Sequence, residues 1–160
     1  MYLSTASLTW TAQPANPTEA IKGQDMALTW RYSLSAEEQT KSQTYFLVKW
    51  SKLNSSSAGY DVVALRTKQT GLPPAYSEQD PHIVVDRATG TSFASLQIND
   101  VRADDEGIYK IEISVEFPGT TIAADHEVNL TVSGRLHTCT INTACTCLQH
   151  GLVRCRWLGD

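Results

Sequence analysis

Cysteine is absent from the first 138 residues of this 160-residue chain, so no disulfide can form within that part. The four cysteines all lie in the last 22 residues: Cys139, Cys145, Cys147 and Cys155. This abrupt change in composition predicts a boundary near residues 132–136. We therefore expect a disordered N-terminus at residues 1–6, a folded domain at residues 7–134, and a cysteine-containing tail at residues 135–160 that is not an independent domain.

Long apolar runs and clusters of one charge are also missing. No stretch approaches the roughly 20 apolar residues that span a bilayer, so we expect no membrane insertion by this chain. The net charge is −4 and no run of Lys or Arg occurs, which argues against nucleic acid or an anionic membrane as a partner. The opening residues MYLSTASLTW do not resemble a signal peptide, which fits either a cytosolic protein or a chain without its first exon.

Catalytic and cofactor motifs are likewise absent. No glycine-rich phosphate loop follows a strand, and no nucleophile is paired with a base in a recognisable order. The adjacent carboxylates Asp104, Asp105 and Glu106 belong to an expected turn. The histidines show no metal-site spacing: His82, His126, His137 and His150. We therefore predict no enzymatic activity, no cofactor, no metal and no small-molecule substrate.

The domain consists instead of short strands. Residues 26–34 alternate apolar and polar side chains with a period of two, and residues 44–52 do the same. Further strands are expected at 60–67, 82–86, 92–98, 107–115 and 125–132, with turn residues between them. Pro14 and Pro17 predict a split first strand at a sheet edge. About eight or nine such strands predict an antiparallel sandwich or barrel, and periodicity does not choose between the two.

One segment makes the choice. Residues 93–111, FASLQINDVRADDEGIYKI, resemble the region between strands E and F of the V-set domains of the immunoglobulin superfamily. Asp105, Gly107 and Tyr109 match the D-x-G-x-Y motif of that family, in which the buried tyrosine bonds to backbone upstream. The family usually pairs the aspartate with an arginine at the start of strand D, and His82 occupies that position here. The resemblance implies an all-β, immunoglobulin-like Greek-key β-sandwich of V type.

The chain departs from the family at the disulfide between strands B and F. Trp30 and Ile111 occupy the two cysteine positions, and Trp50 matches the tryptophan that packs on the bridge. A cross-link over roughly 80 residues would contribute about 4.5 kcal/mol, and burial of an indole contributes at most about 4–6 kcal/mol. Packing of these three side chains can therefore replace the bridge. The 55 positions from Trp50 to Asp105 leave room for the two additional strands of a V-type sheet.

The resemblance implies a recognition or adhesion module of a cell-surface or secreted protein, loosely similar to invertebrate adhesion and allorecognition receptors. It would bind another protein through its G-F-C-C′ sheet face and F–G loop. The face also permits self-association, in which lysines of one chain meet Glu112 of the other. The side chains expected on this binding surface are Tyr45, Leu47, Lys49, Lys110 and Glu112, together with Phe117 as an exposed aromatic at the tip of the F–G loop. On a second interpretation, Tyr45 and Leu47 are covered by a neighbouring strand or by the tail. The alternative function is an intracellular structural immunoglobulin domain of a filament-type protein, a class that often lacks the disulfide.

Two further features leave alternatives open. Asn54 and Asn129 begin N-glycosylation sequons, which slightly favour an extracellular setting. The tail spacing C-x5-C-x-C-x7-C fits the start of a truncated module or an alternative exon end, a set of disulfides with three connectivities, or a metal site.

The domain boundary yields a first prediction. Because every family landmark ends by Val132, expression of residues 1–134 should give a cooperative unfolding transition with the same midpoint as the full chain. Thermal unfolding followed by circular dichroism of both proteins makes the comparison. Failure of the shorter protein to fold would show that the cysteine-containing tail is structural.

Overall fold

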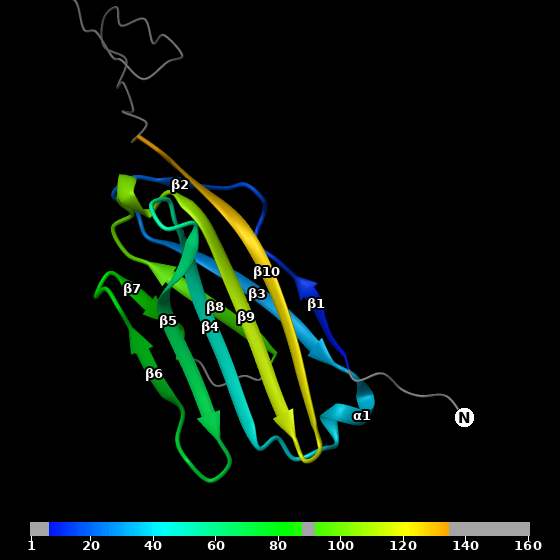
Figure 1. Cartoon of the computed structure of the whole chain (residues 1–160). Coiled ribbons are helices and arrows are strands. Elements are labelled where there is room, and N and C mark those ends of the chain that lie inside the picture. Colours follow the sequence, from blue (N-terminus) through cyan, green and yellow to red (C-terminus); the bar gives the residue numbers. More distant parts are fainter. Residues whose placement is uncertain (1–6, 88–91, 135–160) are drawn as a thin grey trace, which may run out of the picture.

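The computed structural model describes residues 7–87 and 92–134, which form two β-sheets packed face to face (Figure 1). The segments 1–6 and 135–160, for which disorder and a separate tail are expected, lie outside the described residues, as do all four cysteines, His137 and His150.

The elements follow the expected order of short strands. Two single helical turns interrupt them, α1 (Ala36–Gln39) between β3 and β4 and the 3-10 turn η1 (Ala103–Asp105) before β9. The strands are β1 (Leu8–Ala12), β2 (Thr18–Ile21), β3 (Met26–Leu34), β4 (Tyr45–Asn54), β5 (Gly59–Gln69), β6 (Ala75–Glu78), β7 (Ile83–Val85), β8 (Phe93–Ile98), β9 (Gly107–Phe117) and β10 (Thr120–Ser133).

The strand order confirms a sandwich rather than a barrel. One sheet has the order β1-β3-β8-β7 and the other β2-β10-β9-β4-β5-β6. Neighbouring strands are antiparallel except for β2, which runs parallel to β10. The first strand is split as predicted, because β1 joins one sheet and β2 the other. β5 and β6 are the two additional strands for which the spacing leaves room.

The core fills the space between the sheets. Trp30 on β3, Trp50 on β4 and Ile111 on β9 are all 0% exposed, and Trp50 lies directly opposite Ile111 in the register of their strands. Trp30 enters the same core from the facing sheet. The expected packing of large apolar side chains in place of the disulfide is therefore present. Because each buried indole removes a large apolar surface from water, this packing is a major contribution to stability.

The sequence did not reveal the polar partner of this packing. The indole Nε1–H of Trp30 donates a hydrogen bond to Nδ1 of His126 on β10, at 3.1 Å. A disulfide needs no such acceptor, whereas a buried N–H without one costs about 1–3 kcal/mol. His126 thus provides the hydrogen-bond acceptor for the indole N–H of Trp30, a group that a cysteine at this position would not have.

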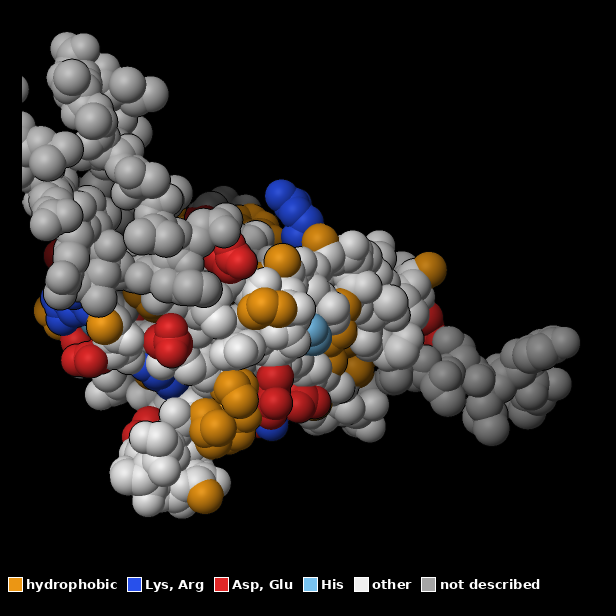
Figure 2. Space-filling model, turned by 90° about the horizontal axis from the view of Figure 1, so that it is seen from above, with side chains coloured by type: hydrophobic (Ala, Val, Ile, Leu, Met, Phe, Trp, Pro, Cys, Tyr) orange, Lys and Arg blue, Asp and Glu red, His pale blue; other side chains and the backbone are white. Residues whose placement is uncertain are grey.

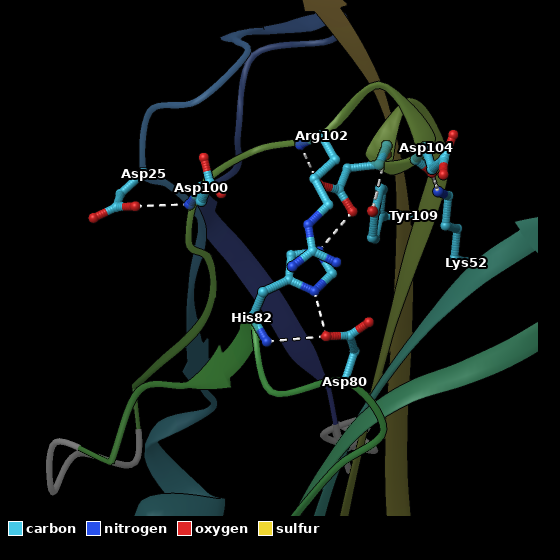
Figure 3. A network of polar contacts seen from close by, with 9 residues as sticks. Asp25, Lys52, Asp80, His82, Asp100, Arg102, Asp104 and Tyr109 are labelled. Atoms are coloured by element: carbon cyan, nitrogen blue, oxygen red, sulfur yellow. Dashed lines mark hydrogen bonds and ion pairs between the residues drawn. The ribbon is translucent and has the colours of Figure 1, made fainter.

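A polar network closes the end of the sandwich at η1 (Figure 3). The carboxylate of Asp105 is bound by His82 Nε2 at 2.8 Å and by the backbone N–H of Arg102 at 2.7 Å. The hydroxyl of Tyr109 donates to the backbone oxygen of Asp105 at 2.9 Å. Asp105, Tyr109 and His82 thus make the contacts that the family motif implies, and these contacts hold the turn that leads into β9.

His82 lies between two carboxylates. Its Nδ1 is 2.5 Å from Oδ1 of Asp80, on the side of the ring opposite Asp105. Burial lowers the pKa of His82, but the hydrogen bonds and charges of Asp80 and Asp105 outweigh this effect and raise the pKa above its usual value. The hydrogen bond from His82 in turn lowers the pKa of Asp80. The charged imidazolium is the form that this site favours.

Phe117 corrects one expectation. The sequence placed it as an exposed aromatic at the F–G tip, but it is 3% exposed and belongs to the core. β9 continues through Phe117, so the alternation that buries Tyr109, Ile111 and Val115 buries Phe117 as well. The exposed tip of the hairpin is only Pro118 and Gly119.

The core yields a second prediction. Trp30→Ala should lower the free energy of unfolding by about 3–5 kcal/mol, because it removes a fully buried indole and leaves a cavity. Chemical denaturation measures the change. Leu72→Ala is the control, since Leu72 is 58% exposed and its truncation should change stability by less than about 0.5 kcal/mol. A loss below about 1 kcal/mol for Trp30→Ala would contradict its place in the core.

The network yields a third prediction. Because the pKa of His82 is raised in the folded state, its stabilising effect is complete below the unfolded value of about 6.5 and is lost as the pH rises through the folded pKa. Stability of the wild type should therefore fall as the pH rises above about 6.5 and through the raised folded pKa of His82. His82→Arg keeps a cation between the carboxylates and should reduce this fall, as measured by denaturation at each pH. An unchanged pH dependence in His82→Arg would exclude His82 as its source.

Candidate functional site: the outer face of the six-stranded sheet

The outer face of the six-stranded sheet is formed by the alternate residues of β4, β9 and β10, which point away from the core. The register of these strands arranges them in successive rows across the sheet. From the hairpin end upward, the rows are Tyr45–Glu116–Thr121, Leu47–Ser114–Ala123, Lys49–Glu112–Asp125 and Ser51–Lys110–Glu127.

A shallow hollow lies over the second and third rows. Ser114 and Ala123 are neighbours in the register and carry the smallest side chains in these rows, so the surface sinks between them. Leu47 forms one wall of the hollow. The rim is charged and consists of Lys49, Lys110, Glu112 and Asp125. The hollow thus combines a floor of small side chains, an apolar wall and a charged rim, and an apolar centre within a polar rim is the usual make-up of a protein-binding surface.

The charges of the rim are paired within the chain. Lys49 Nζ lies 2.5 Å from a carboxylate oxygen of Glu112, and Lys110 Nζ lies 3.2 Å from Asp125 and 3.9 Å from Glu112. The hydrogen bond to Asp125 is the main cause that raises the pKa of Lys110. Such exposed pairs add little stability. The lysines and Glu112, expected to pair between two copies, already have partners in their own chain.

Tyr60 extends this face beyond the residues that the sequence suggested. Its hydroxyl donates to Glu127 at 2.7 Å, and Lys110 lies over its ring at 5.8 Å from the centroid. Burial and the hydrogen bond to Glu127 raise the pKa of Tyr60 to about 12. Tyr60 is still 37% exposed and nearby Val62 38%, so they add an apolar patch on β5.

Five of the six residues expected at the binding surface lie on the outer face, and one does not. Tyr45, Leu47, Lys49, Lys110 and Glu112 share the outer face. Phe117 does not, since it points into the core. Sequence reasoning missed Ser114, Ala123 and Tyr60. The tight turn at residues 117–120 could have located the first two, because it sets the register of β9 against β10.

The two sequons occupy different surroundings. Asn54 ends β4, and its Oδ1 accepts hydrogen bonds from the Ser56 backbone at 2.9 Å and the Ser56 hydroxyl at 2.6 Å. Asn129 is exposed within β10, on the outer face. Carbohydrate at either position stays a prediction.

The acidic run at the E–F turn has structural partners. Lys52 Nζ donates to the backbone oxygen of Asp104, Asp105 binds His82, and Glu106 accepts from the backbone N–H of Val132 at 2.9 Å. Within residues 7–87 and 92–134, no cluster of three or more His, Cys, Asp or Glu could hold a metal ion. None of the helices in this part of the chain has the length and hydrophobicity to cross a membrane. Figure 2 shows acidic, basic and hydrophobic side chains interspersed, with no single charge covering the visible face.

The fold defines the class of protein: a two-sheet sandwich whose larger sheet carries the additional strands β5 and β6, as in immunoglobulin variable domains. A comparison with family models agrees. The immunoglobulin V-set domain model matches residues 13–133, more than half of the chain, and the chain belongs to this family. A search of curated proteins found no match. V-set domains are generally non-enzymatic modules for protein interaction and are commonly extracellular or at the cell surface.

Proposed function

We propose that this protein recognises another protein through the outer face of β4, β9 and β10, with the hollow at Leu47, Ser114 and Ala123 as its centre. The hollow carries the proposal because it combines a floor of small side chains and the apolar wall of Leu47 with a rim of paired charges. A partner would place an apolar side chain over Ser114 and Ala123 and contact Leu47 and Tyr45 beside them. Buried anchors of this kind supply most of the binding energy in protein interfaces.

The charge of the face bears on the partner. The four rows contain the lysines Lys49 and Lys110 and the four carboxylates of Glu112, Glu116, Asp125 and Glu127, so their net charge is −2. Two such faces repel each other, which favours a neutral or basic partner over a second copy. A homophilic contact stays the alternative, and the state of the protein alone in solution distinguishes the two.

The proposed setting is the cell surface or the extracellular space, as part of a recognition or adhesion protein. Family membership supports this setting, and so does the sequon at Asn54, which lies at a hairpin turn. One observation favours the alternative of an intracellular structural domain. The two sheets are joined by Trp30, Trp50 and Ile111 without a disulfide, and such a core folds under reducing conditions. Expression behind a signal peptide, with loss of a glycan in Asn54→Gln, would support the first setting.

The fourth prediction tests the face. Ala123→Arg fills the hollow and Leu47→Asp places a charge on its wall, so each should weaken partner binding by about tenfold or more. Beads coated with the full chain are mixed with cells of the source organism, and bound cells are counted by flow cytometry. Sedimentation velocity of the full chain alone measures self-association.

Ala27→Arg provides the matched control. Ala27 is an exposed alanine on β3, in the other sheet, so the same substitution adds the same charge on the opposite face. Binding should be unchanged in this variant, and all variants should unfold at temperatures close to that of the wild type. Binding that survives both Ala123→Arg and Leu47→Asp would rule out this face as the site.

A further inference from the structure

His126 occupies an unusual place for a titratable side chain. The even-numbered residues of β10 around it point inward, and Ile122, Val128 and Leu130 are buried on the same side. The ring of His126 is half-buried between the sheets, with Trp30 of β3 on one side and Trp10 of β1 on the other. It therefore contacts the side chain that stands where the family has a disulfide cysteine.

The hydrogen bond between Trp30 and His126 requires one protonation state. An indole N–H is a donor only, so Nδ1 of His126 must offer its lone pair. That is possible for the neutral imidazole with its proton on Nε2 and impossible for the imidazolium, in which both nitrogens carry protons. Trp30 is 0% exposed, so water does not reach its side chain to replace the lost acceptor.

The described side chains that contact His126 are uncharged. On β3 the partner of His126 is Trp30. Tyr32 of the same strand lies edge-on to Trp10, and burial raises its pKa, which keeps its phenol neutral. On β9 the residue opposite is Ile111, and on β1 it is Trp10. No salt bridge to His126 occurs among the described residues.

The charged residues next to His126 in β10 point away from the core. Asp125 and Glu127 flank His126 in sequence, but their side chains lie on the outer face, where Asp125 pairs with Lys110 and Glu127 binds Tyr60. The alternation of the strand keeps them apart from the inward-facing imidazole.

Trp10 links the same site to the first strand. Its ring meets the rings of both His126 and Tyr32 edge-on, with centroids 6.2 Å and 6.3 Å apart. Its Nε1–H donates to the backbone oxygen of Asp125 at 3.3 Å. Because β1 belongs to the sheet of β3 and Asp125 to the facing sheet, Trp10 connects the two sheets beside His126.

We propose that His126 is an acid-sensitive latch, whose protonation breaks the hydrogen bond to Trp30 and loosens β1 and Trp10 from β10. The opening is local. At the other site, His82 lies between Asp80 and Asp105 and favours the charged form, so acid preserves the contacts of the E–F turn while it opens the latch. Acid thus preserves the contacts of His82 and breaks the hydrogen bond of His126.

The fifth prediction follows the latch by nuclear magnetic resonance of the full chain, titrated from about pH 8 to about pH 5. The ring nitrogens of His126 should show the Nε2-protonated tautomer at the higher pH. As His126 gains its second proton, exchange protection of the Trp30 indole proton should fall by about tenfold or more, the factor expected for loss of one hydrogen bond. Amides of β1 should lose protection with the same midpoint.

His126→Gln is the matched variant, because its side-chain oxygen accepts a hydrogen bond but does not titrate. In this variant, protection of Trp30 and of β1 should no longer depend on pH. His82→Arg should leave the response of Trp30 intact. If His126→Gln does not fold, the wild-type titration alone decides. An Nδ1-protonated tautomer, or a Trp30 indole that stays protected after His126 is protonated because Trp10 stabilises the cation, would overturn the proposal.

Discussion

The packing of Trp30 into the core formed with the facing sheet is the interaction on which the rest of this structure depends. In a sandwich, two sheets with no backbone hydrogen bonds between them must be joined by side chains alone. A disulfide would do this covalently, and here a fully buried indole does it by excluding water and by donating to His126. The substitution introduces one polar atom that needs a partner, and that partner is a histidine that can accept the hydrogen bond only in its neutral form. A disulfide at this position would need no such partner.

The burial of one side of β9 in this core determines which of its side chains lie on the outer surface. Its odd-numbered residues, among them Tyr109 and Ile111, are buried, so its even-numbered residues must face outward. The turn before the strand is held by Asp105, and Gly107, with a φ of +143°, lies where an added Cβ would come within 3.2 Å of Lys52. Because the start of β9 is fixed, its register with β4 and β10 is fixed as well. Lys110, Glu112 and Ser114 therefore occupy defined positions on the outer face. The hollow follows from this order.

Part of this arrangement is predictable from local patterns. The alternation in β3, β4 and β9 identifies Trp30, Trp50 and Ile111 as inward-facing, and the D-x-G-x-Y motif identifies the sandwich. Both signals are local, because side-chain alternation and turn conformation depend on residues close in sequence. Phe117 is misjudged because the turn residues after it predict a strand that ends at residue 115, whereas β9 continues for two more residues. His126 and Tyr60 could not be assigned, since their partners lie on strands far away in the sequence.

By itself, the sequence determined the class of fold, the absence of a disulfide within the domain and which side of each long strand is buried. Only the tertiary structure decided which side chains meet across strands and sheets. The hollow needs Leu47 beside Ser114 and Ala123, and the proposed latch needs His126 in contact with both Trp10 and Trp30. Periodicity states that a residue faces inward or outward, whereas contact depends on register and on how the two sheets pack. The register of the strands and the packing of the two sheets depend on the free energy of the whole core and not on any one segment.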